Sequence, residues 1–186
     1  MRVLVAIAAS VFVVSACAQG SDKSSDQASS EERAGSVAAT TTAAAAAAPL
    51  GKAVSGAHAK KLMHDRHEGM EAIGDAMKLV SGELRKDAPD LGKIRSGAGT
   101  FARLAPQVKG WYPPGTGPDV GKTRAKAAIW QKPADFRAKA LAFESAATKF
   151  NAAAKAGDLA AIRAAHGDLG KTCKACHDPY REPEHD

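Results

Sequence analysis

Two cysteines and a histidine near the end of the chain form its most specific motif. Cys173, Cys176 and His177 stand in the run K-T-C-K-A-C-H-D at residues 171–178. The C-x-x-C-H spacing is the attachment signature of a c-type haem, in which each thiol adds to a vinyl group and forms a thioether. On a helix the two sulfurs share one face, and the imidazole lies near them, where it can bind iron. We therefore expect one covalent haem c per chain, with His177 as an axial ligand.

Two other chemistries use cysteine pairs, and both fit this motif less well. A redox dithiol of the C-x-x-C type is usually found between a strand and a helix, and no strand pattern surrounds Cys173. A structural zinc site usually closes with a second pair of Cys or His ligands, and no such pair accompanies His177. A non-haem bundle with a dithiol or metal site is therefore the third hypothesis for this chain.

Length and composition bound what the rest of the chain can be. The 186 residues suffice for one ordinary domain with additional segments, and abundant alanine with only 5% aromatic residues favours helices. The formal net charge is +6, but basic residues are scattered among acidic ones, so we expect no nucleic-acid partner. A mildly basic surface suits acidic redox partner proteins, whose identity stays open, or the propionates of a haem.

Residues 1–19 have the pattern of a secretory signal segment. A basic residue is followed by an apolar run up to Val14 and by small residues, and this run is too short to span a membrane. The V-S-A-C sequence that ends at Cys17 is typical of a lipobox, which predicts a lipid anchor at Cys17. The A-C-A sequence around the same cysteine also fits an ordinary cleavage site. Both interpretations predict export, so we expect a periplasmic protein, tethered to a membrane where Cys17 carries lipid.

A polar, low-complexity segment separates this signal from the rest of the chain. Residues 20–54 are rich in Ser, Ala, Thr and Gln and contain almost no bulky apolar side chain. Such a segment cannot bury enough surface to fold by itself. We therefore expect a disordered tether at 20–54, followed by a folded domain at 55–186.

Apolar residues recur every three or four positions in four segments of this domain, which predicts four amphipathic helices. Ser81-Gly82 is expected to end the first helix, and Pro106 to distort the last turn of the second. Gly157 should close the third, and Pro183 bars extension of the fourth. The expected spans are 55–80, 90–108, 133–157, and 158 to a stop before 183. No helix can bury its apolar face alone, so the predicted fold class is all-α, an antiparallel four-helix bundle with haem between its helices.

The second axial position of the iron decides its chemistry, and seven Met or His side chains are candidates for it. Met70 lies on the apolar stripe of the first helix, from which a thioether can reach a haem held by the fourth. The same position also suits a core-filling methionine. His64 and His67 lie off the stripe, and His166 shares a helix with the haem, so these three are poor candidates. The full set is Met63, Met70, Met77, His58, His64, His67 and His166.

Three short elements extend over about residues 55–183 and together carry a family resemblance. They are Arg66…Met70, Ile129-Trp130…Phe136 and Cys173-Lys174-Ala175-Cys176-His177…Tyr180-Arg181. This combination resembles the class II cytochromes c, the cytochrome c-prime family. In that family the residue four after the arginine lies over the distal face of the iron, and an apolar residue there leaves the iron five-coordinate and high-spin. The resemblance implies that Met70 places this chain in the low-spin branch with His and Met ligation.

The same resemblance implies roles for three further residues. Arg66 is implied to pair with a haem propionate, and a guanidinium in an otherwise apolar stripe does need an anion. The alternative is an arginine that extends to the edge of the bundle. Trp130 and Tyr180 are implied to pack beside the haem. The family includes dimers built from the first two helices, so a homodimer is an expectation for this chain.

These observations lead to a main hypothesis and an alternative. Iron held by both His177 and Met70 has no open site, which predicts that the chain is not an enzyme but an exported monohaem electron carrier. If Met70 does not bind the iron, or is easily displaced, the haem is five-coordinate and the protein binds nitric oxide or carbon monoxide.

Overall fold

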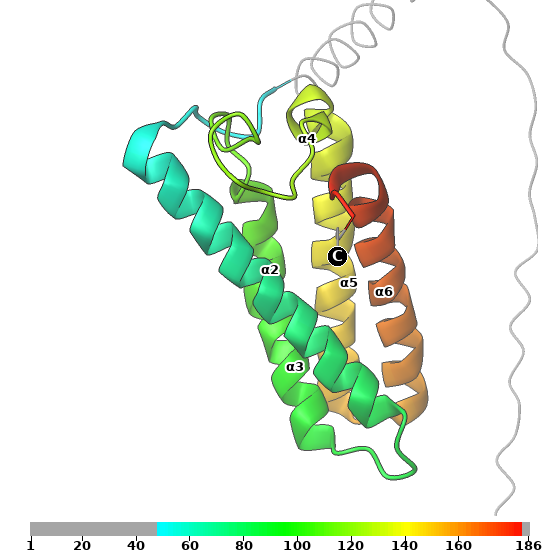
Figure 1. Ribbon diagram of the computed structural model, residues 1–186. Coiled ribbons are helices and arrows are strands. Elements are labelled where there is room, and N and C mark those ends of the chain that lie inside the picture. Colours follow the sequence, from blue (N-terminus) through cyan, green and yellow to red (C-terminus); the bar gives the residue numbers. More distant parts are fainter. Residues whose placement is uncertain (1–47, 184–186) are drawn as a thin grey trace, which may run out of the picture. The chain divides into compact units, whose positions relative to one another are not determined.

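The computed structural model describes residues 48–183, and six helices lie in this range (Figure 1). The long helices are α2 at Gly56–Leu84, α3 at Leu91–Leu104, α5 at Pro133–Ala156 and α6 at Leu159–Tyr180. A 3-10 helix, η1, at Ala105–Gly110 extends α3, and the single turn α4 at Ala128–Gln131 precedes α5. The four long helices confirm the predicted bundle. The predicted signal segment, the anchor at Cys17 and most of the predicted tether lie outside the described residues.

Short local signals set the ends of the helices. Asp90 accepts a hydrogen bond from the Gly92 amide over 2.8 Å at the start of α3, and Asp158 accepts one from the Ala160 amide over 2.9 Å at the start of α6. Both side chains therefore satisfy amides that have no partner within the helix. Gly157 ends α5, as predicted, in the left-handed conformation at φ 85°, which glycine adopts without strain.

The end of α2 differs from the prediction, and the end of α3 confirms it. Ser81 and Gly82 lie inside α2, which continues to Leu84. An exposed glycine in a helix costs only about 1 kcal/mol relative to alanine, whereas Glu83 and Leu84 beyond it are buried. Their packing outweighs the local penalty, so the predicted stop was wrong. Pro106 lies in the first turn of η1, where the α-helix tightens into a 3-10 helix.

The core lies where the apolar stripes of the helices meet. Phe101 of α3 and Phe150 of α5 pack edge to face, with ring centroids 5.8 Å apart. The stripe of α5 alternates a large and a small side chain, so that neighbouring helices interdigitate with it. Its buried members are Phe136, Ala140, Phe143, Ala147, Phe150 and Ala154.

α2 and α6 make few contacts with each other. α2 packs on α3, α3 on α5 and α5 on α6, whereas α2 and α6 barely meet. They are joined at one end, where Ser81 Oγ and His166 Nε2 lie 3.0 Å apart and Arg163 donates to the Leu84 carbonyl. From there the two helices diverge towards the N-terminal end of α2 and the C-terminal end of α6 (Figure 1).

The last residues of the predicted tether contact the helical domain. Leu50 is buried, the Val54 amide donates to the Pro114 carbonyl over 2.9 Å, and Arg137 donates to the Ala48 carbonyl over 2.9 Å. Residues 48–54 therefore pack against the bundle. Within the range 48–183, no helix combines the length and apolar character that crossing a membrane requires.

Candidate haem site

The two motif cysteines lie on α6 and face the interior of the bundle. Cys173 and Cys176 are both half-buried and packed against the hydrophobic core. Burial raises the pKa of Cys173, and it raises the pKa of Cys176 to about 11. The site is therefore apolar enough to keep both sulfurs uncharged, and the donor set of two thiols on one helical face fits attachment to a porphyrin edge.

His177 occupies the last turn of α6 and is half-buried. Burial lowers the pKa of its imidazole, and the positive charges of Arg181 and Arg124 lower it further. A neutral imidazole keeps the nitrogen lone pair that a metal ligand needs. A hollow of about 260 Å³ adjoins the ring and is lined by Lys126, His177, Asp178, Arg181, Glu182 and Pro183. A neutral imidazole beside a hollow fits the predicted role of His177 as an iron ligand.

Met70 lies at the middle of α2. Its side chain is half-buried and packs against the hydrophobic core. Gly69 beside it is covered by the indole of Trp111, since a Cβ at Gly69 would lie 2.4 Å from Trp111 Cη2. Met70 is thus on the interior side of the bundle and not in solvent. Its role as an iron ligand stays a prediction.

The other candidate ligands have different surroundings. Met63 is buried next to Gly121, so it fills the core. His64 and His67 are exposed on the outer face of α2, as their register predicts. His166 shares a hydrogen bond with Ser81, well before the cysteines of α6.

Arg66 is the most deeply buried charged side chain near the site, with only 4% of its surface exposed. Its guanidinium donates to the Thr116 carbonyl over 3.2 Å and to Thr123 Oγ1 over 2.9 Å, and it lies 4.8 Å from the ring centroid of Tyr112. A weaker bond of 3.5 Å reaches the Trp111 carbonyl. Arg66 therefore holds the loop 111–127, which connects η1 to α4.

The charge of Arg66 has no acidic partner in the part of the chain that the structure describes. Its contacts are neutral oxygens and an aromatic ring, and burial lowers its pKa without a neighbouring carboxylate to offset this. A buried cation with neutral partners fits a propionate of a bound haem. Its burial contradicts the alternative of an arginine that extends to the bundle edge. The propionate pairing stays a prediction.

Trp130 and Tyr180 frame the same region from α4 and α6. The Trp130 indole donates to the carbonyls of Tyr112 and Pro113 over 3.0 and 3.2 Å. Tyr180 is buried, donates its hydroxyl to Asp135, and packs edge to face on a phenylalanine of α5 with centroids 5.4 Å apart. Trp130 therefore contacts the loop 111–127, and Tyr180 contacts α5. A direct contact of either residue with the haem stays a prediction.

Two loop residues that were not predicted from the sequence complete this region. Tyr112 is buried, and burial raises its pKa to about 12. Thr116 is fully buried and donates to the Pro113 carbonyl over 2.8 Å. Proline and glycine in the run W-Y-P-P-G-T-G-P at residues 111–118 predict an irregular loop. Its two adjacent aromatic residues were the available signal that the loop is packed and not solvated.

The backbone closes the loop onto the end of α6. Ala125 and Arg181 form an isolated antiparallel bridge, and the Lys126 amide donates to the Tyr180 carbonyl over 3.0 Å. The Glu182 amide donates in turn to the Arg124 carbonyl over 2.8 Å. One segment is thus bound to α2 through Arg66 and to α6 through these contacts, and it connects the two helices that otherwise diverge.

The fold and the site define a c-type cytochrome built on a helical bundle. The sequence profile of the family described as Cytochrome C' matches residues 61–181. The chain belongs to the cytochrome c' family, and haem c, bound covalently with one group per chain, is its cofactor. This excludes the hypothesis of a non-haem dithiol or metal-binding bundle.

Two relatives illustrate the similarity of sequence. The chain is 35% identical over 117 residues to cytochrome c' of Pararhodospirillum photometricum, and the aligned part covers 63% of this chain and 93% of the relative. It is 32% identical over 133 residues to cytochrome c-554 of Cereibacter sphaeroides, which covers 67% of this chain and 83% of that protein. Neither match supports the narrower prediction of a methionine-ligated, low-spin branch.

Two solved structures illustrate the similarity of fold. One is a cytochrome c' with an unusual ligand-controlled dimer dissociation, with a TM-score of 0.63 and 28% identity over 69% of this chain and 99% of that chain. The other is the nitric oxide complex of a mutant of cytochrome c prime from Alcaligenes xylosoxidans, with a TM-score of 0.61 and 31% identity over 68% of this chain and 97% of that chain. The first of these proteins thus forms a dimer that dissociates, and the second is a mutant with bound nitric oxide.

Proposed function

We propose that this chain is a haem c protein that binds a small diatomic gas, nitric oxide or carbon monoxide, on the face of the iron opposite His177. The observation that carries the proposal is the likeness of this chain to a mutant of cytochrome c prime solved as a nitric oxide complex, over 97% of that chain. This likeness supports the gas-binding alternative better than the electron carrier that the sequence alone favoured. A bound haem would supply an iron centre for the gas.

The chain's own residues have separate roles in this proposal. Cys173 and Cys176 hold the cofactor on α6, and His177 offers its neutral imidazole to the iron. Arg66 supplies a positive charge and fixes the loop 111–127, which covers the region from one side. Met70 lies on the interior side of α2, and in this proposal it would not bind the iron permanently. No side chain needs to act as a catalyst, so we propose a binding protein and not an enzyme.

Titration of the ferrous protein with carbon monoxide tests the proposal directly. We expect one gas molecule per haem at saturation and a shifted Soret band. The ferric protein should show a high-spin spectrum, because no sixth ligand holds the iron at rest. A protein whose ferrous spectrum stays unchanged under saturating carbon monoxide would contradict gas binding.

One observation favours the electron carrier as a second candidate. Met70 stands where an apolar residue is typical of five-coordinate members, and its thioether lies on the interior side of α2. Thioether ligation gives a coordinatively saturated iron suited to electron transfer. Under this second candidate the ferric spectrum is low-spin, and Met70→Leu converts it to high-spin. Met77→Leu, a half-buried methionine on the same helix, is the matched control and should leave the spectrum unchanged.

The cellular location of the chain is a further part of the proposal. We propose that the chain is exported to the periplasm, since it carries a signal-like N-terminus and belongs to a c-type cytochrome family. A lipid at Cys17 would tether it there. Mass spectrometry of the mature N-terminus tests both statements, because a diacylglyceryl cysteine and an ordinary cleaved end differ in mass.

A further inference from the structure

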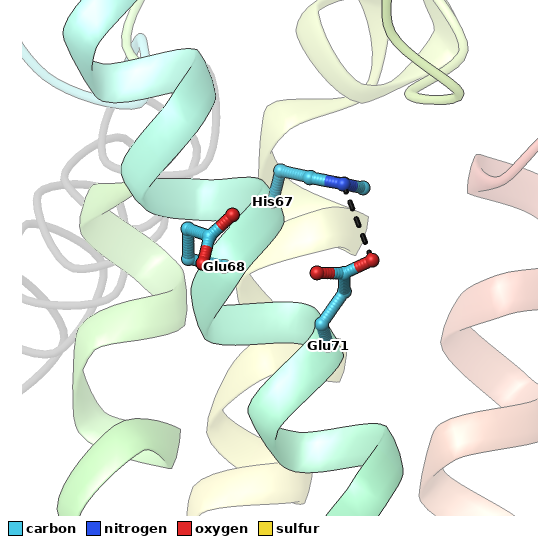
Figure 2. Close-up of side chains that lie close together, drawn as sticks. All are labelled: His67, Glu68 and Glu71. Atoms are coloured by element: carbon cyan, nitrogen blue, oxygen red, sulfur yellow. Dashed lines mark ion pairs between the residues drawn. The ribbon is translucent and has the colours of Figure 1, made fainter.

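The outer face of α2 carries a group of metal-binding side chains that the haem site does not use. His67, Glu68 and Glu71 bring a ring nitrogen and two carboxylates within 4.8 Å of one another. Figure 2 shows His67 and Glu71 turned towards each other from successive turns of α2. His64 lies one turn earlier, with Nδ1 3.9 Å from Glu68 Oε1. The four residues follow the i, i+3, i+4, i+7 spacing that places side chains on one helical face.

The separations suit direct coordination of an ion. His67 Nε2 lies 3.3 Å from Glu71 Oε1. Two ligand atoms bound to zinc at 2.0–2.1 Å with a tetrahedral angle lie about 3.3 Å apart. The side chains of His67 and Glu71 are 67% and 59% exposed, so an ion can reach them without any movement of the backbone.

Glu68 and Glu71 also differ from other acidic residues of α2 in their ion-pair partners. Asp65 pairs with Lys61 and Asp75 with Lys78. Glu68 and Glu71 pair only with His64 and His67 in the described part of the chain. Neither glutamate therefore has a lysine or arginine partner among these ion pairs, which leaves its carboxylate available to a bound ion.

We propose that His67, Glu68 and Glu71, together with His64, form a surface site for a divalent transition-metal ion. Mixed imidazole and carboxylate ligands suit zinc, copper and nickel, whereas calcium and magnesium prefer oxygen ligands alone. The site lies on the opposite face of α2 from Arg66, so it is independent of the haem and of the proposed gas binding.

Calorimetric titration of the full-length, haem-loaded protein with zinc chloride near neutral pH tests the site. We expect saturable binding of one zinc ion per chain. His67→Gln and Glu71→Gln should each weaken it by at least about tenfold, the loss expected when a metal site is disturbed. The matched control is His58→Gln, an exposed histidine of α2 outside the group, which should bind zinc as the wild type does.

A second measurement tests the imidazole itself. With copper(II) as the probe, the electron paramagnetic resonance spectrum should show nitrogen hyperfine structure that His67→Gln reduces. All substituted side chains are exposed, so circular dichroism should show an unchanged fold. Absence of saturable zinc binding, equal affinity in the wild type and His67→Gln, or displacement of zinc by equimolar calcium would each overturn the proposal.

Discussion

Ser81 of α2 and His166 of α6 form a hydrogen bond, with Oγ and Nε2 3.0 Å apart. This contact lies at the end of the bundle where the two helices meet, and His177 follows 11 residues later, about 16 Å along α6. From this end α2 and α6 diverge towards the residues that we assign to the haem. The Ser81–His166 contact therefore sets how far α2, with Met70, stands from the helix that carries the cofactor.

The same pair predicts a loss of stability in mild acid. Burial lowers the pKa of His166, so the folded protein favours the neutral ring. As the pH falls below about 6.5, His166 takes up a proton in the unfolded chain before it does so in the folded protein. The free energy of unfolding therefore decreases until the pH is below the pKa of His166 in the folded protein. Urea unfolding of the haem-loaded protein between pH 8 and 5 measures this decrease. His166→Gln keeps a polar group near Ser81 and should show a smaller decrease.

Removal of the hydroxyl tests the contact at constant pH. Ser81→Ala should lower the free energy of unfolding by about 0.5–1.5 kcal/mol, the usual net contribution of one hydrogen bond. The measurement is urea unfolding at pH 8, where the ring is neutral. A stability equal to that of the wild type would show that the contact does not hold α2 against α6.

The helices were predictable because the signals for them are local. The alternation of Phe and Ala in α5 is an uninterrupted period of three and four, and all six stripe residues are buried. Ser81-Gly82 misled the prediction, because the stop signal is visible in the sequence while the burial of Leu84 beyond it is not. Local propensity is a weak guide where tertiary packing opposes it.

The haem-binding motif was equally visible, but the loop that completes the region was not. Arg66 contacts Thr116 and Thr123 over separations of 50 and 57 residues, and one of its main acceptors is a backbone carbonyl. Every residue carries such an acceptor, so no sequence pattern marks it. The sequence indicated that Arg66 needs a partner for its charge. It could not indicate that the first partners in the fold are neutral loop oxygens.

Gly69 and Gly74 of α2 allow a matched pair of substitutions. A Cβ at Gly69 would lie 2.4 Å from Trp111 Cη2, whereas a Cβ at Gly74 meets nothing within 4 Å. Gly69→Ala should therefore displace the indole and destabilise the protein by about 1–3 kcal/mol. Gly74→Ala should stabilise it by up to about 1 kcal/mol through helix propensity alone. Thermal unfolding of both variants measures the difference, and equal melting temperatures would contradict the close packing of Trp111.

Arg66 should be sensitive to replacement even by another cation. Arg66→Lys keeps the charge but loses the planar fork that reaches Thr116 and Thr123 together. We expect the variant to lose about 1.5–3 kcal/mol, the range for hydrogen bonds to a charged group. Proteolysis within the loop 111–127 should also become faster. Arg103→Lys, on the exposed side of α3, is the control and should change neither measurement.

Tyr180 connects the end of α6 to α5 through its hydroxyl, which donates to the carboxylate of Asp135. Its ring is buried against Phe136, so Tyr180→Phe keeps the packing and removes only the hydrogen bond. A bond to a charged acceptor contributes about 1.5–3 kcal/mol, and Asp135 keeps Lys139 at 3.6 Å as a remaining partner, which places the expected loss near the lower limit. Urea unfolding of the haem-loaded protein measures it. Because His177 lies one turn before Tyr180, the variant should also broaden the Soret band as the ligand-bearing turn loosens. A variant as stable as the wild type, with an unchanged Soret band, would show that the hydroxyl does not position this turn.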